Sequence, residues 1–218
     1  MTPSLRATRP NDARSGGHSA GLPADSRAKL SAFLDLLVKW NRVYNLTAIR
    51  DRARMETHHI QDALAVLPYL PDAAGARVLD VGSGGGIPGI PLAIARPDTT
   101  VVVLDANGKK AAFLAQAVIE LGLRNVRAVV SRVEDYVPET RFDVVISRAF
   151  SDLQTFVRAA MPHLAADGIV IAMKGALSRN EIDALPREVV VMGTPKLAVP
   201  GVDAERHLVI VRPARERA

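Results

Sequence analysis

A run of closely spaced glycines is the feature of this sequence best suited to chemistry. It reads Asp80-x-Gly82-x-Gly84-x-Gly86 and follows the apolar stretch Arg77 to Val81. Glycine has no Cβ and reaches positive φ without strain, so such a loop lets a ligand lie directly against the backbone. The loop is therefore predicted to leave a buried strand, cross a binding edge and enter a helix.

A carboxylate after the next apolar run strengthens this prediction. Asp105 ends the stretch Val101 to Asp105, where a Rossmann-like fold places the acid that accepts hydrogen bonds from a ribose diol. Two common nucleotide motifs are excluded. Ile87 stands where a dinucleotide loop needs its third glycine, and no Gly-Lys-Ser or Gly-Lys-Thr follows as in a Walker loop.

The glycine spacing and the following acid resemble the first motif of the class I S-adenosylmethionine-dependent methyltransferases. The resemblance implies S-adenosyl-L-methionine as the cofactor, with the glycine loop beside its methionyl part and Asp105 on its ribose. It also implies an α/β, Rossmann-like fold with a seven-stranded, mostly parallel sheet.

Further segments narrow the resemblance. They are Trp40-Asn-x-x-x-Asn45-Leu-Thr47, His58-x-x-x-Asp62, Gly82 to Pro91, Asp105 to Lys110, Phe113-Leu114, Phe142-Asp143, Ser147-Arg-Ala149 and Lys174-Gly175. In this order they resemble one family, the bacterial small-subunit ribosomal RNA guanine-N7 methyltransferases (RsmG, formerly glucose-inhibited division protein B). The resemblance covers about residues 30 to 212. At Ala63 and Ala106 the chain lacks a serine hydroxyl that the family often has.

The resemblance implies a reaction and a set of contacts. The family methylates N7 of a guanine in the 530 loop of 16S ribosomal RNA, so this RNA or the small ribosomal subunit particle is the expected partner. The positions implied to line the cofactor site are Gly82, Ser83, Gly84, Ile87, Asp105, Val133, Glu134 and Arg148.

This reaction is chemically reasonable for the chain. Guanine N7 has an in-plane lone pair and no proton, so attack on a sulfonium methyl needs no general base and positioning can carry the catalysis. The chain has neither the Asn-Pro-Pro-Tyr segment used for amino methylation nor a cysteine for attack on a pyrimidine ring. Arg148, at the end of the fourth expected strand, is predicted to position the guanine because arginine donates to its O6 edge.

Four basic residues are predicted to contact RNA phosphates. Lys109, Lys110, Arg132 and Lys174 each lie near the carboxyl end of an expected strand, the edge where ligands bind in parallel sheets. Simpler interpretations remain open: an exposed helical turn for Lys109 and Lys110, a solvated strand end for Lys174, and an ion pair with a neighbouring acid for Arg132.

Two other pairs of residues are noteworthy, and a packing role is favoured for both. His58 and His59 are adjacent on an expected helix and point in different directions, so packing or hydrogen bonding is expected rather than a metal site. Trp40 and Tyr44, one helical turn apart, are expected to anchor a helix on the core rather than stack on RNA bases.

The elements that position these residues follow from apolar periodicity. Helical spacing predicts one helix from Ser26 to about Trp40 and another over Met55 to Leu70. Beyond them, runs rich in Val and Ile alternate with helical stretches, which predicts parallel strands joined by helices. The expected strands are Arg77 to Val81, Thr100 to Leu104, Val126 to Val130, Val144 to Ile146, Ile169 to Met173, Val189 to Met192 and His207 to Val211, and the helices between them are Gly89 to Ala95, Lys109 to Leu121 and Leu153 to Leu164.

This pattern divides the chain into four parts. Residues 1–24 and 213–218 are expected to be flexible tails, because they are rich in small residues, proline or arginine and lack periodicity. Residues 25–72 are expected to form an N-terminal helical extension packed on the core, and residues 73–212 the methyltransferase domain.

Composition excludes several classes of protein. With 218 residues, 48% of them hydrophobic and 23% charged, the chain is predicted to be a soluble globular protein. The absence of cysteine excludes a disulfide framework, a thiolate metal site and a cysteine nucleophile. No apolar run approaches the roughly 18 residues of a membrane span, and the first 25 residues lack the apolar stretch of a signal peptide. A cytoplasmic protein, monomeric by default, with no metal and no membrane partner is expected.

Net charge is a weak argument for an RNA partner. Of the formal +5, residues 1–24 contribute +2 and residues 212–218 another +2, which leaves +1 for the body of the chain. This low charge keeps two alternatives open: a small-molecule methyltransferase with the same cofactor site, and a non-catalytic RNA-binding protein of the same fold.

Overall fold

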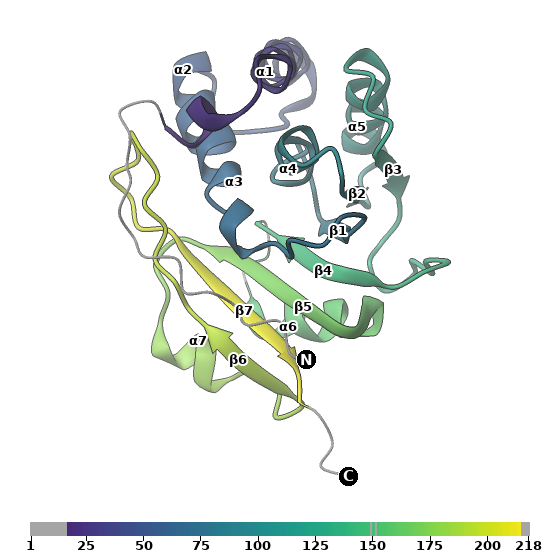
Figure 1. The fold of residues 1–218 in the computed structure, drawn as a ribbon, viewed down its shortest axis with the longest axis vertical. Coiled ribbons are helices and arrows are strands. Elements are labelled where there is room, and N and C mark those ends of the chain that lie inside the picture. The colour runs from purple at the N-terminus through teal and green to yellow at the C-terminus, as the bar shows by residue number, and fades with distance from the viewer. Residues whose placement is uncertain (1–16, 149, 151, 215–218) are drawn as a thin grey trace.

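A seven-stranded sheet forms the centre of the protein in a computed structural model that describes residues 17–148, 150 and 152–214 (Figure 1). The strands are β1 (Arg77–Val81), β2 (Thr100–Asp105), β3 (Val126–Val130), β4 (Phe142–Ser147), β5 (Leu164–Lys174), β6 (Val189–Gly193) and β7 (His207–Pro213). The helices are α1 (Ala24–Tyr44), α2 (Arg52–Met55), α3 (Asp62–Leu64), α4 (Gly89–Ala95), α5 (Gly108–Glu120), α6 (Leu153–Ala160) and α7 (Arg179–Asp183), with the π-helical turn η2 (Glu56–Gln61) and the 3-10 helices η1 (His18–Gly21), η3 (Leu67–Tyr69) and η4 (Met161–His163). The predicted fold class is confirmed.

The order of the strands creates a place where a ligand can bind. The strands lie in the order β3-β2-β1-β4-β5-β7-β6, and neighbouring pairs from β3 to β5 are parallel. β2 and β3 are added in turn on one side of β1, and the chain then crosses back so that β4 pairs with β1 on its other side. In open sheets of this kind the crevice beyond the carboxyl ends of the two central strands is the usual ligand site. β7 is antiparallel to β5, so its amino end lies at this same edge.

Helices cover both faces of the sheet, as the apolar strands require. The helices α1, α3, α4 and α5 lie over one face and α6 and α7 over the other (Figure 1). Successive residues of β1 enter different cores: Val78 packs with the first group of helices, and Leu79 and Val81 pack with α6. Burial on both faces explains why these strands read as continuous apolar runs.

The long helix α1 anchors the N-terminal part on the core. Phe33 and Leu37 are fully buried one turn apart, and the Phe33 ring lies 6.3 Å from that of Phe113 on α5. Trp40 lies 5.7 Å from the same phenylalanine and 5.2 Å from Tyr44. The predicted packing role is therefore confirmed for Trp40, whereas Tyr44 packs on Trp40 but is 40% exposed. No helix in the described part of the chain is both long and apolar enough to cross a membrane.

The predicted N-terminal tail is wrong at its end. His18–Gly21 form η1, where the His18 backbone N–H donates to Gln61 Oε1 (2.6 Å) and Gln61 Nε2 donates to Ser19 Oγ (2.8 Å). These partners lie more than 40 residues away in the sequence, so local periodicity carries no sign of them. Residues 1–16 and 215–218 of the predicted tails lie outside the described residues, and Pro213 belongs to β7.

One helix is shorter than predicted. The helix expected over Leu153 to Leu164 ends at Ala160, and the chain continues as η4, which has a proline in its first turn. Proline lacks the N–H that an α-helix needs in its interior. The next strand, β5, consequently begins at Leu164, five residues before its predicted start.

Candidate functional site

Three residues in the left-handed region of φ shape the loop after β1. Gly82, Gly84 and Gly86 have φ of 69°, 57° and 78°, which residues with a Cβ adopt only with strain. A Cβ on Gly86 would lie 2.7 Å from Ile90 Cδ1, so this glycine serves packing. Beside Gly84 the space is open, because the nearest atom to an added Cβ is the Gly82 carbonyl oxygen at 3.8 Å. The loop therefore offers its backbone to a ligand at Gly84.

Asp105 lies at the end of β2, next to this open backbone. Its carboxylate is buried: Oδ2 accepts from the Gly84 N–H (2.9 Å) and Oδ1 accepts from the Asn107 N–H (2.8 Å). An ionised carboxylate has about four lone-pair positions, so about two remain for hydroxyl donors. Open backbone beside a carboxylate with spare acceptors fits the methionyl and ribose parts of S-adenosylmethionine.

Asp80 and Ser83 stabilise the loop from within. Asp80 is fully buried, its Oδ2 accepts from the Gly89 N–H (2.9 Å), and burial raises its pKa to about 7. Ser83, expected at the cofactor, is also buried and its Oγ donates to the Asp80 carbonyl (2.9 Å). The Ser83 hydroxyl thus turns into the loop, away from the surface that a ligand would contact.

The other residues expected at the cofactor are separated. Ile87 is buried in the core under α1 and α4, whereas Val133 is buried in the core beside α6. The Val133 carbonyl accepts from His163 Nε2 (2.9 Å), which fixes the chain after β3. Glu134 follows it and is exposed. Of this group, only the Glu134 side chain and the backbone around it are presented at the surface.

A hydrogen bond joins the end of β4 to the glycine loop. Ser147 Oγ donates to the Val81 carbonyl (2.7 Å), directly before Gly82. Arg148 follows Ser147, so its backbone starts in the crevice between β1 and β4. The residue predicted to position the guanine therefore lies beside the loop predicted to hold the cofactor.

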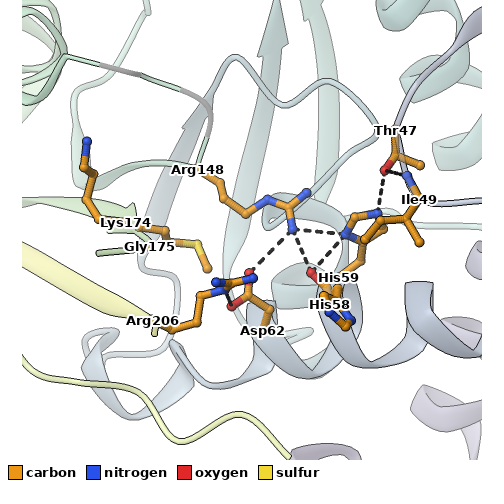
Figure 2. Close-up of a pocket in the computed structure, with 10 residues that line it drawn as sticks. Thr47, Ile49, His58, His59, Asp62, Arg148, Lys174, Gly175 and Arg206 are labelled. Carbon is orange, nitrogen blue, oxygen red and sulfur yellow. Dashed lines mark hydrogen bonds and ion pairs between the residues drawn. The ribbon is translucent and has the colours of Figure 1, made fainter. Parts of the chain in front are cut away.

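The N-terminal helices hold the Arg148 side chain (Figure 2). Its Nη1 donates to the His58 carbonyl (3.0 Å), and it lies 3.1 Å from His59 Nδ1 and 3.5 Å from Asp62 Oδ2. All three partners come from η2 and the first residue of α3. The helical extension thus completes a site whose other parts come from the sheet.

Arg206 joins the same cluster from the far end of the sequence. Its Nε donates to Asp62 Oδ1 (3.2 Å), opposite Arg148 (Figure 2). Arg206 directly precedes β7, whose amino end lies at the ligand edge because that strand is antiparallel. It was absent from the sequence-based prediction, and the reversed direction of the last strand is the signal that would have found it.

A pocket of about 310 Å³ opens over this cluster. Its lining residues are Thr47, Ile49, His58, His59, Asp62, Arg148, Met173, Lys174, Gly175 and Arg206. Burial lowers the pKa of His59 to about 4, and Arg148 acts in the same direction, so the imidazole is neutral at pH 7. Burial also raises the pKa of Asp62, against the opposing effect of the two guanidinium groups. With two guanidinium groups and one carboxylate, the pocket favours ligands rich in hydrogen-bond acceptors.

The four basic residues predicted to bind phosphate have different surroundings. Lys109 and Lys110 lie in the first turn of α5, where Asn107 Oδ1 accepts from both backbone N–H groups, at 3.0 and 3.4 Å. Arg132 is exposed, and among the described residues it forms no ion pair with the neighbouring acids. All three side chains remain accessible to a polyanion.

Lys174 lines the pocket but is not a solvated strand end. Its Nζ lies 2.6 Å from Glu181 Oε1, and its side chain is only 12% exposed. Glu181 belongs to α7, which begins with a capping box between Ser178 and Glu181 and brings this carboxylate to the end of β5. A solvated strand end is therefore wrong, and this charge is already paired with a carboxylate.

The predicted hydrogen-bonding role of the adjacent histidines is confirmed. His58 Nδ1 lies 2.7 Å from Thr57 Oγ1, and His59 Nε2 lies 2.8 Å from Thr47 Oγ1. Across the described ranges, no three side chains of the metal-binding types come together.

Comparison with known proteins identifies the family. The family model for rRNA small subunit methyltransferase G matches residues 26–209. The protein named Ribosomal RNA small subunit methyltransferase G in Laribacter hongkongensis is 54% identical over 188 residues, which cover 86% of this chain and 89% of the relative. The protein of that name in Chromobacterium violaceum is 55% identical over 180 residues, covering 83% and 85% of the two chains.

Solved structures agree on the fold. TrmN from Thermus thermophilus superposes with a TM-score of 0.55 at 20% identity, covering 70% of this chain and 48% of its own. The O-methyltransferase NcsB1 from neocarzinostatin biosynthesis, solved with S-adenosylmethionine, superposes with a TM-score of 0.56 at 19% identity, covering 66% and 51%. The chain spans about half the length of these two structures.

The residues matched by the family model include the glycine loop, Asp105 and the Arg148 cluster. This chain therefore belongs to the rRNA small subunit methyltransferase G family and is an S-adenosylmethionine-dependent methyltransferase.

Proposed function

We propose that this protein methylates N7 of a guanine in the 530 loop of 16S ribosomal RNA, in the cytoplasm and as a monomer. The observation that carries the proposal is the pocket of Arg148 and Arg206, which opens at the carboxyl end of β5 and the amino end of β7. Arg148 directly follows Ser147, whose hydroxyl bonds to the residue before the glycine loop. The relatives' name, which specifies ribosomal RNA of the small subunit, supports the choice of substrate.

The pocket matches the edge of guanine that carries O6 and N7. Both atoms are acceptors, and an arginine N–H is the matching donor. A guanidinium bound to O6 orients the ring and leaves the N7 lone pair free to attack. Because N7 has no proton to lose, neither His59 nor Asp62 has to act as a base, and both serve instead to hold the guanidinium groups. Bound S-adenosylmethionine supplies the methyl group, whose bond to sulfur breaks as its bond to N7 forms.

The remaining contacts are assigned from position. The Gly84 backbone and the Asp105 carboxylate bind the methionyl and ribose parts of the cofactor, since they lie together at the carboxyl ends of β1 and β2. Lys109, Lys110 and Arg132 contact RNA phosphates, because they are the accessible cations among those predicted for this edge.

Transfer of tritiated methyl groups tests the proposal. The acceptors are small-subunit particles and free 16S RNA from a strain that lacks this protein, followed by cleavage at N7-methylguanine to map the product. A single new site in the 530 loop is expected. Label that remains on a cofactor shown by calorimetry to bind, or that appears at another RNA site, would refute the assignment.

Two variants distinguish the loss of a pocket contact from a general effect of substitution on the protein. Arg148→Lys keeps the charge but loses the planar fork, and it is expected to lower the transfer rate at least tenfold, the order expected for a lost charge-assisted hydrogen bond. Lys29→Met is the control. Lys29 pairs with Asp25 in a separate cleft that includes Asn125, before β3 and away from the ligand edge. The control is expected to transfer methyl groups like the unmodified protein.

A further inference from the structure

The way Arg148 is held points to residues that act through it. Nη1 carries two hydrogens, and its two neutral neighbours are the His58 carbonyl and His59 Nδ1. Asp62 lies farther away, at 3.5 Å, and is shared with Arg206. The carboxylate therefore neutralises both arginines, whereas the histidine segment sets the direction of the Arg148 guanidinium (Figure 2).

The hydrogen bonds around His59 select one tautomer of its ring. Nδ1 lies 3.1 Å from Arg148 Nη1, which always carries hydrogens, and 3.0 Å from the His58 carbonyl. A proton on Nδ1 could donate to the His58 carbonyl, but it would also face the charged Nη1–H donor of Arg148. A hydrogen bond from a charged donor is about twice as strong as one between neutral groups, so the contact with Arg148 favours Nδ1 as the acceptor and places the ring proton on Nε2.

Thr47 completes this arrangement on the other side of the ring. Its Oγ1 lies 2.8 Å from His59 Nε2 and accepts from the Ile49 N–H (3.2 Å). The Thr47 hydroxyl can donate or accept, and as an acceptor it stabilises the Nε2–H tautomer, which leaves a lone pair on Nδ1 for Arg148. His59 is only 3% exposed, so water does not replace either partner.

We infer that Thr47 and His59 form a relay that positions Arg148: Thr47 holds the Nε2–H tautomer of His59, and the Nδ1 lone pair then directs the guanidinium into the pocket. Both are positioning residues, and their effect on the reaction rests on the proposed function. The π-helical turn η2 contributes because it presents the His58 carbonyl and the His59 ring to the same arginine.

Two amide substitutions at His59 distinguish its two nitrogens. His59→Asn places its amide oxygen near the position of Nδ1 and keeps an acceptor for Arg148. His59→Gln reaches toward Nε2, keeps the contact with Thr47 and removes that acceptor. The Gln variant is expected to lower kcat about tenfold with little change in KM or in cofactor affinity, the order expected for one lost hydrogen bond to a charged group. The Asn variant is expected to keep most of kcat.

Thr47→Val tests the other half of the relay, with Thr57→Val as a matched control. Thr57 is a half-buried threonine of η2 that bonds to the His58 ring and the Arg54 carbonyl. Thr47→Val is expected to lower kcat, Thr47→Ser to restore it, and Thr57→Val to leave it unchanged. If kcat falls equally in the two His59 variants, and each fall matches the drop in melting temperature, then His59 has a purely structural role and the relay is overturned.

Nitrogen NMR of isotope-labelled histidine tests the relay without any activity. The unmodified protein is expected to show His59 protonated at Nε2 only, and Thr47→Val to lose this preference. A proton on Nδ1 in the unmodified protein would overturn the relay even if the enzyme methylates the RNA. A correct tautomer in a protein that transfers no methyl group would instead refute the proposed function and leave the relay standing.

Discussion

The buried carboxylate of Asp62 is the point at which stability and the pocket depend on the same side chain. Its side chain is 3% exposed, and it faces Arg148 at 3.5 Å and Arg206 at 3.2 Å, whose side chains are 28% and 24% exposed. Asp62→Asn removes the negative charge and leaves two guanidinium groups facing an uncharged amide. Breaking a buried ion pair from one side costs roughly 3–5 kcal/mol, and because both arginines can turn partly to water we expect about 3 kcal/mol.

Urea unfolding at pH 7 measures this cost, and a double-mutant cycle isolates its cause. Arg206→Met leaves Asp62 with one guanidinium partner and is expected to cost less, about 1–2 kcal/mol. In the double variant the two costs should fall short of additivity by about 1 kcal/mol, since the residues are in direct contact. Asp98→Asn is the control, because Asp98 forms an exposed pair with Arg96 (2.9 Å) and should change stability far less.

The result that would refute this reasoning is a cost below about 1 kcal/mol for Asp62→Asn, or strict additivity with Arg206→Met. Either would mean that the two arginines do not depend on the carboxylate. A further readout is the methyl transfer rate: Asp62→Asn should lower it under conditions in which the protein stays folded, because both guanidinium groups beside the pocket lose the charge that neutralises them.

Three further predictions follow from the same structure. Gly89→Ala should cost roughly 2–3 kcal/mol in urea unfolding because its Cβ would lie 2.8 Å from Asp80 Oδ2, whereas Gly84→Ala should cost only about 1 kcal/mol for its positive φ; the reverse order would contradict the packing argument. Asp105→Asn should weaken S-adenosylmethionine binding at least tenfold by calorimetry. The amide replaces one acceptor oxygen by an NH2 donor, which faces one of the two backbone N–H groups and cannot accept from a ribose hydroxyl. Unchanged affinity would count against the ribose role of Asp105. The pKa of His59 is lowered from 6.5 to about 4, so between these pH values His59 is protonated in the unfolded chain but not in the folded protein, and about 3 kcal/mol of stability is lost as the pH falls through this range. The raised pKa of Asp80 has the opposite effect on stability. The test therefore compares the pH dependence of unfolding of the unmodified protein, which should show the loss due to His59, with that of His59→Asn, which should not.

The sequence by itself determined the fold class, the binding loop and the family. Strands buried on both faces must be apolar at every position, and a loop that meets a ligand through its backbone must be rich in glycine. Both requirements are local, so the valine-rich runs and the glycines at 82, 84 and 86 show them directly. The place of Arg148 at the ligand edge could also be predicted from the sequence, because it follows a strand whose carboxyl end could be predicted.

Tertiary structure decided which side chains meet. Asp62 and Arg206 lie 144 residues apart and come together because β7 is antiparallel. Lys174 is paired because α7 brings Glu181 to the end of β5, and Ser83 turns inward because the loop folds onto Asp80. Each contact depends on the direction of a strand or helix relative to another, and residue type and local spacing do not encode that direction.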